Sequence, residues 1–211
     1  MYLLTTNNKL LFTLGAVLAA LLVVLLIIAP LFFTKLLHHK FNFKVYRKLY
    51  RIAMHKDFYL INNYPLIKDG IQFGQIDHLL FTDKFIYVIN DKVLSGVISG
   101  KKMDNVWISY DLKGNKSEFY NPLIINNRRL SVFSETKEID ERYMISVVVL
   151  NNDVKIKNLN EMNTENSVII RKKDLNKLIS LNEKRNVGKF KLDKLDLQVK
   201  ELAKDIYKLE K

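Results

Sequence analysis

Apolar residues gather in an uninterrupted run near the start of the chain, Leu10–Phe33, which holds no charged residue. A helix rises about 1.5 Å per residue, so a helix of this length exceeds the roughly 30 Å hydrocarbon core of a bilayer. The run is longer than the apolar stretch of a signal peptide and lacks a small-residue cleavage site. The pattern therefore predicts an uncleaved transmembrane helix.

After this run the pattern becomes that of a folded domain, with shorter apolar segments between turn residues. Val45, Leu49 and Ile52 recur at helical spacing, and the later apolar runs are short, as strands are. Strands are expected at 58–67, 75–82, 85–90, within 95–119, and at 143–151, 153–159 and 167–172. Helices are expected from Asn121-Pro122 and over 174–183, the second capped by Asp174. The order predicts one α/β (α+β) domain over residues 43–182.

The C-terminal segment, residues 183–211, has a third pattern. Its apolar residues are spaced by alternating steps of three and four, which is a heptad seam formed by Leu192, Leu195, Val199, Leu202, Ile206 and Leu209. The seam covers only about three heptads, so two interpretations stay open. The amphipathic helix either packs on its own domain or recruits a second copy or a partner through 192–209.

Charge and cysteine content narrow the function. The formal net charge is +12, which favours anionic partners such as nucleic acid or an acidic membrane surface. Cysteine is absent from the chain, which excludes disulfides, thiolate zinc sites and cysteine nucleophiles. A basic patch in the first helix of the domain is formed by Lys44, Arg47, Lys48 and Arg51. Lipid headgroups, DNA and RNA are all candidate partners of this patch.

The basic residues also predict the orientation of the chain, because basic flanks stay on the cytoplasmic side. Before the apolar run only Lys9 and the terminal amine are positive, whereas residues 35–56 are rich in lysine and arginine and contain no acid. We expect residues 1–9 outside the cell, 10–33 in the membrane and 34–42 as a basic juxtamembrane linker. The domain and the C-terminal helix would then face the cytoplasm from a single-pass cell-membrane protein.

The stretch "QIDHLLFTDKFIYVINDKVLSG", Gln75–Gly96, carries the candidate chemistry. On a strand, side chains alternate faces, so Asp77 points with Leu79, and Asn90 points with Lys92 on the next strand. This arrangement, with Asp77 on one strand and Asn90 and Lys92 on its hairpin partner, resembles the core of the PD-(D/E)XK nucleases. In that core two acids hold magnesium, and the lysine positions or activates water for phosphodiester attack.

More narrowly, the chain resembles the nuclease-related domain, NERD, of bacterial proteins. The resemblance rests on five elements in order: Ile76-Asp77-His78, Ile89–Lys92, Gly96–Gly100 as "GVISG", Trp107, and Asn121-Pro122. It implies a restriction-endonuclease-like mixed sheet flanked by helices, and magnesium-dependent cleavage of DNA or RNA. In this implied site Asp77 is a metal ligand, Lys92 orients water, and Gln75 touches the metal-bound water or a phosphate.

This chain departs from the family pattern at the second acid. The family glutamate falls on Asn90, which would be a weak, uncharged magnesium ligand. Asp91 is adjacent but on the opposite face, so it replaces the missing acid only if the strand carries a bulge. A glutamine that usually follows the Asn-Pro pair falls on Ile125. We therefore expect weak or lost nuclease activity, with a noncatalytic nucleic-acid-binding or membrane scaffold protein as the alternative.

Overall fold

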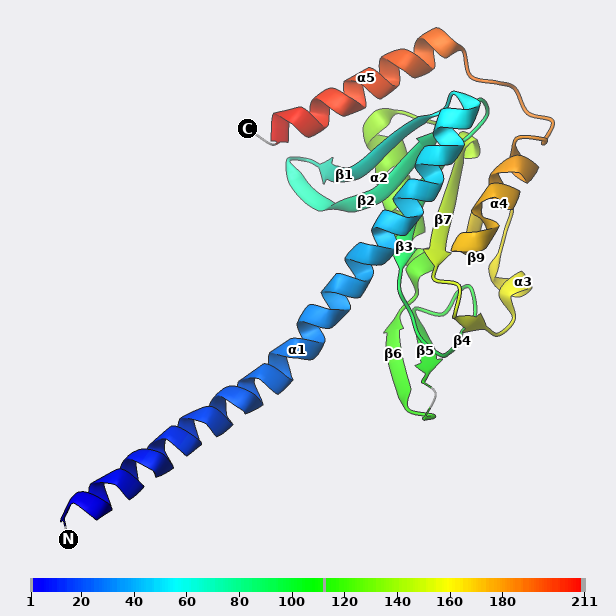
Figure 1. The fold of residues 1–211 in the computed structure, drawn as a ribbon. Helices are drawn as coiled ribbons and strands as arrows, with labels where there is room; N and C mark the ends of the chain where they lie inside the picture. Colours follow the sequence, from blue (N-terminus) through cyan, green and yellow to red (C-terminus); the bar gives the residue numbers. More distant parts are fainter. Residues whose placement is uncertain (1, 112, 210–211) are drawn as a thin grey trace. The chain divides into compact units, whose positions relative to one another are not determined.

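The computed structural model describes the backbone of residues 2–111 and 113–209, and the side chains within these ranges other than those of residues 2–16, 30–35, 159–160 and 207–209. The chain divides into two compact units, residues 1–40 and residues 41–211. Helix α1, Tyr2–Lys56, contributes backbone to both units (Figure 1). Residues 34–42, expected as a linker, are helical.

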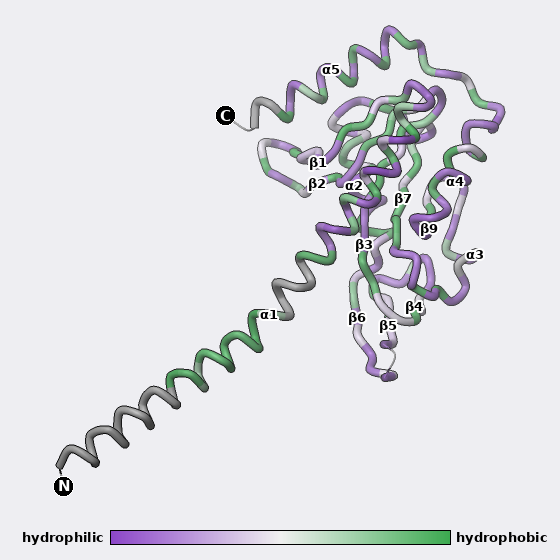
Figure 2. Tube along the Cα trace, in the orientation of Figure 1, coloured by the Kyte–Doolittle hydropathy of each residue, from purple (hydrophilic) through white to green (hydrophobic). Residues whose placement is uncertain are grey.

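In the first unit, the described side chains of residues 17–28 are apolar and exposed, and Figure 2 shows them as a continuous hydrophobic stretch of α1. The predicted span, Leu10–Phe33, falls in part on residues 10–16 and 30–33, whose side chains are outside the described residues. Where the structure describes the chain, no helix has both the length and the apolar character that crossing a bilayer requires.

The second unit is built around two sheets. The larger has the order β1-β2-β3-β7-β9, and the smaller has the order β6-β5-β4-β8. The strands are β1 (Tyr59–Lys68), β2 (Ile71–Phe81), β3 (Ile86–Lys92), β4 (Val97–Ser99), β5 (Val106–Tyr110), β6 (Lys116–Tyr120), β7 (Met144–Leu150), β8 (Lys155–Ile156) and β9 (Ser167–Arg171). The first two pairings of the larger sheet are antiparallel, and β3, β7 and β9 are parallel. The mixed sheet that the family resemblance implies is thus confirmed.

Helices cover both faces of the larger sheet (Figure 1). They are α2 (Pro122–Lys137), α3 (Leu159–Met162), α4 (Leu175–Asn182) and α5 (Leu192–Leu209), with single turns η1 (Glu141–Tyr143) and η2 (Lys172–Asp174). The domain part of α1 and helix α4 pack on one face, which we call the α1/α4 face. Helices α2 and α5 pack on the other, the α2/α5 face. Strand β7 is buried along its whole length, as its continuous apolar run predicts.

The predicted amphipathic helix of the domain is confirmed by burial. Val45 and Leu49 are fully buried and Ile52 nearly so, all against the α1/α4 face. Asn121 caps α2, accepting a hydrogen bond from the backbone N–H of Leu123 at 2.9 Å. Asp174 occupies the N-cap position of α4, as expected, but its side chain forms no capping hydrogen bond with that helix.

The C-terminal helix packs on its own domain. Leu195 and Leu202 are buried in the same cluster as α2, and Val199 and Ile206 pack against that cluster. Lys137 Nζ of α2 forms an ion pair with Asp205 Oδ2 of α5 at 2.7 Å. Leu192 is exposed, and the side chain of Leu209 is outside the described residues. The seam therefore serves intramolecular packing in this structure.

Gly100 and Trp107, two residues of the family-like motif, pack together at the smaller sheet. A Cβ on Gly100 would lie 2.3 Å from the Trp107 ring, so only glycine fits beside the indole. Trp107 Nε1 donates to the carbonyl of Lys101 at 2.8 Å, and Asn121 Nδ2 donates to the carbonyls of Lys102 and Asp104. These motif residues are structural and hold the loop that precedes β5.

Candidate functional site

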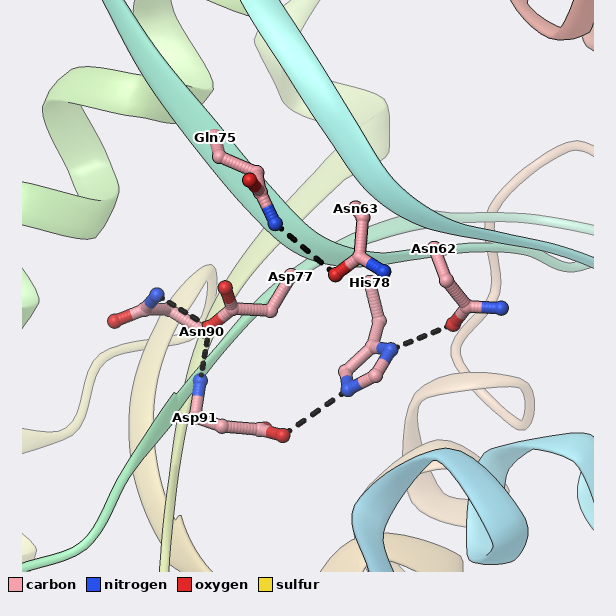
Figure 3. A network of polar contacts seen from close by, with 7 residues as sticks. All are labelled: Asn62, Asn63, Gln75, Asp77, His78, Asn90 and Asp91. Atoms are coloured by element: carbon pink, nitrogen blue, oxygen red, sulfur yellow. Dashed lines mark hydrogen bonds and ion pairs between the residues drawn. The ribbon is translucent and has the colours of Figure 1, made fainter. Parts of the chain in front are cut away.

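The hairpin of β2 and β3 brings Asp77 and Asn90 together (Figure 3). His78 pairs with Ile89 across the hairpin, so the preceding Asp77 faces the following Asn90. Asn90 Nδ2 donates to Asp77 Oδ2 at 2.7 Å, and the backbone N–H of Asp91 donates to the same oxygen at 2.8 Å. Asn90, at the position expected for the second metal ligand, is therefore a hydrogen-bond donor to Asp77, the expected first ligand.

The side chain of Asp91 points away from Asp77, although its backbone N–H donates to the Asp77 carboxylate. Strand β3 pairs with β7 residue for residue from Ile86 to Lys92, without the register shift of a bulge. The Asp91 side chain points to the α1/α4 face, where its Oδ2 lies 3.0 Å from Nε2 of His78. Both side chains are almost completely buried. Asp91 therefore does not replace the missing acid beside Asp77.

His78 is held from both sides. Its Nδ1 lies 2.6 Å from Oδ1 of Asn62 on β1, and its Nε2 faces Asp91 on β3 (Figure 3). When the imidazole carries both protons, each N–H donates to an oxygen and the carboxylate balances its charge. The histidine of the "IDH" motif thus joins three neighbouring strands. Asn62 is a member of this network that sequence reasoning missed, because its role depends on the pairing of β1 with β2.

A local change in strand geometry lies beside Asp77. Alternation of side chains breaks in both strands at the same level: Ile61 and Tyr64 of β1, three residues apart, face the α2/α5 cluster, as do Ile76 and Leu79 of β2. Asn63 has φ 54°, in the left-handed region that asparagine tolerates better than most residues. This conformation allows the side chains of both strands to change the face to which they point, while the pairing register of the strands stays the same at this level.

Gln75 lies away from the expected metal position as a result. Its Nε2 donates to Asn63 Oδ1 at 3.0 Å, and its side chain is exposed (Figure 3). Lys92 ends β3, two residues beyond Asn90, and is partly buried. Among the described residues it forms no hydrogen bond or ion pair with Asp77 or Asn90. Of the four predicted site residues, the fold joins Asp77 and Asn90 only.

The residues around Asp77 do not fit a magnesium site of the expected kind. Magnesium in proteins is held by one or two carboxylates and by waters, in strict octahedral geometry. Here one carboxylate oxygen of Asp77 already accepts two N–H hydrogen bonds. The position of the second carboxylate is occupied by the amide of Asn90. Within the described part of the chain, no three His, Asp or Glu side chains are grouped to hold a metal ion.

The residues of the predicted basic patch line a pocket on the α1/α4 side of the domain. Lys44, Arg47, Lys48 and Arg51 line one pocket of about 580 Å³ between α1 and the segment η2–α4. Lys172 lines the same pocket from the other side. It lies far from the patch in sequence and cannot be placed there from composition alone.

Comparison with protein families identifies the domain. The family model described as "Nuclease-related domain", NERD, matches residues 38–151, which is more than half of the 211-residue chain. The match begins within α1, at residue 38, and ends at residue 151, just after β7. The resemblance expected from the motifs is thus confirmed. Neither the curated proteins nor the solved structures contain a match to this chain.

Proposed function

This chain belongs to the nuclease-related domain (NERD) family, and from that premise we propose that its domain has lost metal-dependent phosphodiester cleavage and acts by binding. One observation carries the proposal. The amide of Asn90 donates to Asp77 Oδ2 at 2.7 Å, at the position where the resembled nucleases hold a metal ion between two acids. The amide N–H supplies the positive partner of the carboxylate.

The charge lost when asparagine replaces the family glutamate explains why magnesium binding and catalysis should be lost. Replacing a carboxylate by an amide removes one negative charge from a site whose ion must be partly dehydrated before it binds. Losing a single preorganised electrostatic group lowers catalysis by about 10²-fold or more. Asp91 cannot compensate, since its carboxylate is committed to His78 on the other face.

The test is a cleavage assay of the full-length protein on supercoiled plasmid and single-stranded RNA, with and without magnesium. We expect no magnesium-dependent cleavage by the unmodified protein and no chemical-shift change at Asp77 during a magnesium titration. Asn90→Glu should gain magnesium binding, whereas Gln72→Glu, which adds the same charge at an exposed position of β2, should not. Cleavage by the unmodified protein that Asp77→Ala abolishes would contradict the proposal.

We also propose that the domain is held at the cytoplasmic face of the cell membrane. This proposal rests on the uncharged segment Leu10–Phe33 and on the basic residues that follow it. A reporter fused after Lys211 should be active in the cytoplasm, and the chain should resist alkaline extraction from membranes. Protease access to the fused reporter from outside intact cells would refute the orientation.

Nucleic acid is the partner class that the family and the net charge of +12 support. If DNA or RNA binds through its phosphates, the affinity should fall steeply as salt rises, because each neutralised phosphate releases counterions. Filter binding at several salt concentrations measures this slope. An affinity that is independent of salt would speak against phosphate contacts.

A further inference from the structure

The pocket between α1 and the segment η2–α4 has an unusual concentration of positive charge. Its cationic lining residues are Lys44, Arg47, Lys48, Arg51, Lys56 and Lys172. On α1, Lys44, Arg47, Lys48 and Arg51 lie three or four positions apart in the pairs 44/47, 44/48, 47/51 and 48/51, so these four share one helix face. No acidic residue lines the pocket.

These cations form no close ion pair with the described residues of the protein, although the charge of Asp174 acts on Lys48. The described residues form eight ion pairs, and none of them involves a cation of this pocket. Elsewhere on the domain, by contrast, Lys116 pairs with Glu118 and Lys189 pairs with Asp83, both at 2.7 Å. An anionic ligand would supply the missing counter-charge.

Lys48 fixes the shape of the pocket. Its Nζ donates to the backbone carbonyls of Lys172 and Lys173, each at 2.8 Å, and so ties η2 to α1. Partial burial, followed by the charge of Lys172, lowers the pKa of the Lys48 ammonium. Lys48 therefore supports the wall of the pocket, while Arg51 and Lys172 remain available to a ligand.

The pocket is independent of the Asp77–Asn90 site. Val45 and Leu49 of α1 pack with Leu80 on the α1/α4 face of the larger sheet. Asp77 points with Leu79 to the opposite face. The sheet therefore separates the two sites, and an anion held between α1 and α4 does not reach Asp77.

Size and lining indicate the kind of anion. A volume of about 580 Å³ lies within the range of pockets that enclose small molecules, which is about 300–1,000 Å³. Lysine and arginine together are the usual ligands of phosphate groups. Asn176 and Ser180 add neutral hydrogen-bonding groups, and Ile52 and Ile179 add an apolar part. A duplex would instead be expected to use an extended basic surface.

We propose that this pocket binds a compact organic molecule that carries two or more phosphate groups. Two sources share this chemistry: a free nucleoside polyphosphate and the headgroup of a phosphorylated inositol lipid. Multiple phosphates match the several cations of the pocket, and the organic part contacts the neutral and apolar side of the pocket. The site is a function additional to the lost cleavage and does not depend on it.

Calorimetry on the full-length protein in neutral detergent tests the ligand class. The probes are ATP without magnesium, inositol 1,4,5-trisphosphate and inorganic phosphate. ATP or the inositol phosphate should bind at least about tenfold more tightly than inorganic phosphate, because more cations are engaged. Preference for ATP identifies a free nucleotide, and preference for the inositol phosphate identifies a lipid headgroup. Equal, weak binding of all three probes would overturn the proposal.

Variants then locate the site. Arg51→Ser combined with Lys172→Ser should weaken binding by about tenfold or more, since each removes charged hydrogen bonds to phosphate. Lys116→Ser combined with Lys189→Ser removes the same charge from residues outside the pocket and should have little effect. Equal losses in both double variants would show a net-charge effect and refute the site. Displacement of the bound probe by duplex DNA through Arg51 and Lys172 would also refute it. Urea midpoints confirm that both double variants are folded.

Discussion

His78 and Asp91 form a buried pair on the face of the sheet that points away from Asp77, with 3.0 Å between His78 Nε2 and Asp91 Oδ2. Asn62 holds the other ring nitrogen, so the pair links β1, β2 and β3. Asp77 and Asp91 thus have different roles. Asp91 links the strands through His78, and Asp77 accepts a hydrogen bond from Asn90 on the opposite face.

The first prediction concerns this pair. Asp91→Ala should lower the free energy of unfolding by about 3–5 kcal/mol, because it leaves a buried imidazole without its partner. Asp153→Ala, at an exposed position, is the control and should be nearly neutral. Urea unfolding followed by circular dichroism measures both. Equal stability of the two variants would show that the pair contributes nothing.

The second prediction concerns the C-terminal helix. Leu202, 3% exposed, lies in the core cluster of the α2/α5 face, whereas Leu197 on the same helix is 60% exposed. Leu202→Asp buries an uncompensated charge and should detach α5 and lower the urea midpoint, whereas Leu197→Asp should not.

Sedimentation of the same samples distinguishes intramolecular packing from self-association. We expect the oligomeric state to be the same for Leu202→Asp and the unmodified protein. A variant that dissociates from an oligomer while its domain stays folded would instead assign the seam to an intermolecular coiled coil.

The third prediction concerns Gly100. A Cβ at this position would lie 2.3 Å from the Trp107 ring, so Gly100→Ala should displace the indole and destabilise the smaller sheet by about 1–3 kcal/mol. The chain contains one tryptophan, so its fluorescence reports the displacement directly. Gly188→Ala, where no atom lies within 4 Å of the added carbon, is the matched control. An unchanged emission maximum in Gly100→Ala would contradict the packing.

The fourth prediction is a pH dependence at Glu183. Burial is the main cause that raises the pKa of this carboxyl above 4.5, although Thr82 donates to it at 2.7 Å. A carboxyl with a raised pKa in the folded state binds its proton more tightly there, so stability falls as the pH rises from about 4.5 through the folded pKa. Glu183→Gln should therefore stabilise the protein at pH 7.

Thermal unfolding at several pH values measures this effect. The advantage of Glu183→Gln over the unmodified protein should shrink as the pH falls below 4.5, where the carboxyl is protonated in both the folded and the unfolded chain. Glu161→Gln, at an exposed position, is the control. A constant difference between Glu183→Gln and the unmodified protein at all pH values would mean that ionisation is not its cause.

Local periodicity was sufficient to predict much of the fold and one pair of the site. The alternation along β2 and β3 places Asp77 with Leu79 and predicts that Asn90 shares its side of the hairpin. The apolar run of β7 predicts a strand buried on both faces. These features depend on neighbours in sequence or on a single hairpin, so composition and spacing contain them.

The remaining features depend on contacts between distant segments. Strict alternation along β2 places Gln75 on the same face as Asp77, which is not what the structure shows. The difference comes from the left-handed conformation of Asn63, which the sequence does not predict. Lys48 and Lys172 are 124 residues apart, and only the completed sheet brings α4 beside α1. The heptad seam of α5 fits either a partner or its own domain, and in the structure it packs into the apolar cluster that α2 and β1 share.

The proposed loss of the metal site at Asn90 also implies that folding is independent of ion supply. Two carboxylates facing each other across β2 and β3 would repel, and a domain built that way would lose stability whenever a chelator or a fall in cellular magnesium removed the ion between them. Asn90 and Asp77 attract each other without any ion. The domain should therefore keep its shape through magnesium starvation, a condition in which a working two-acid relative would loosen at this hairpin.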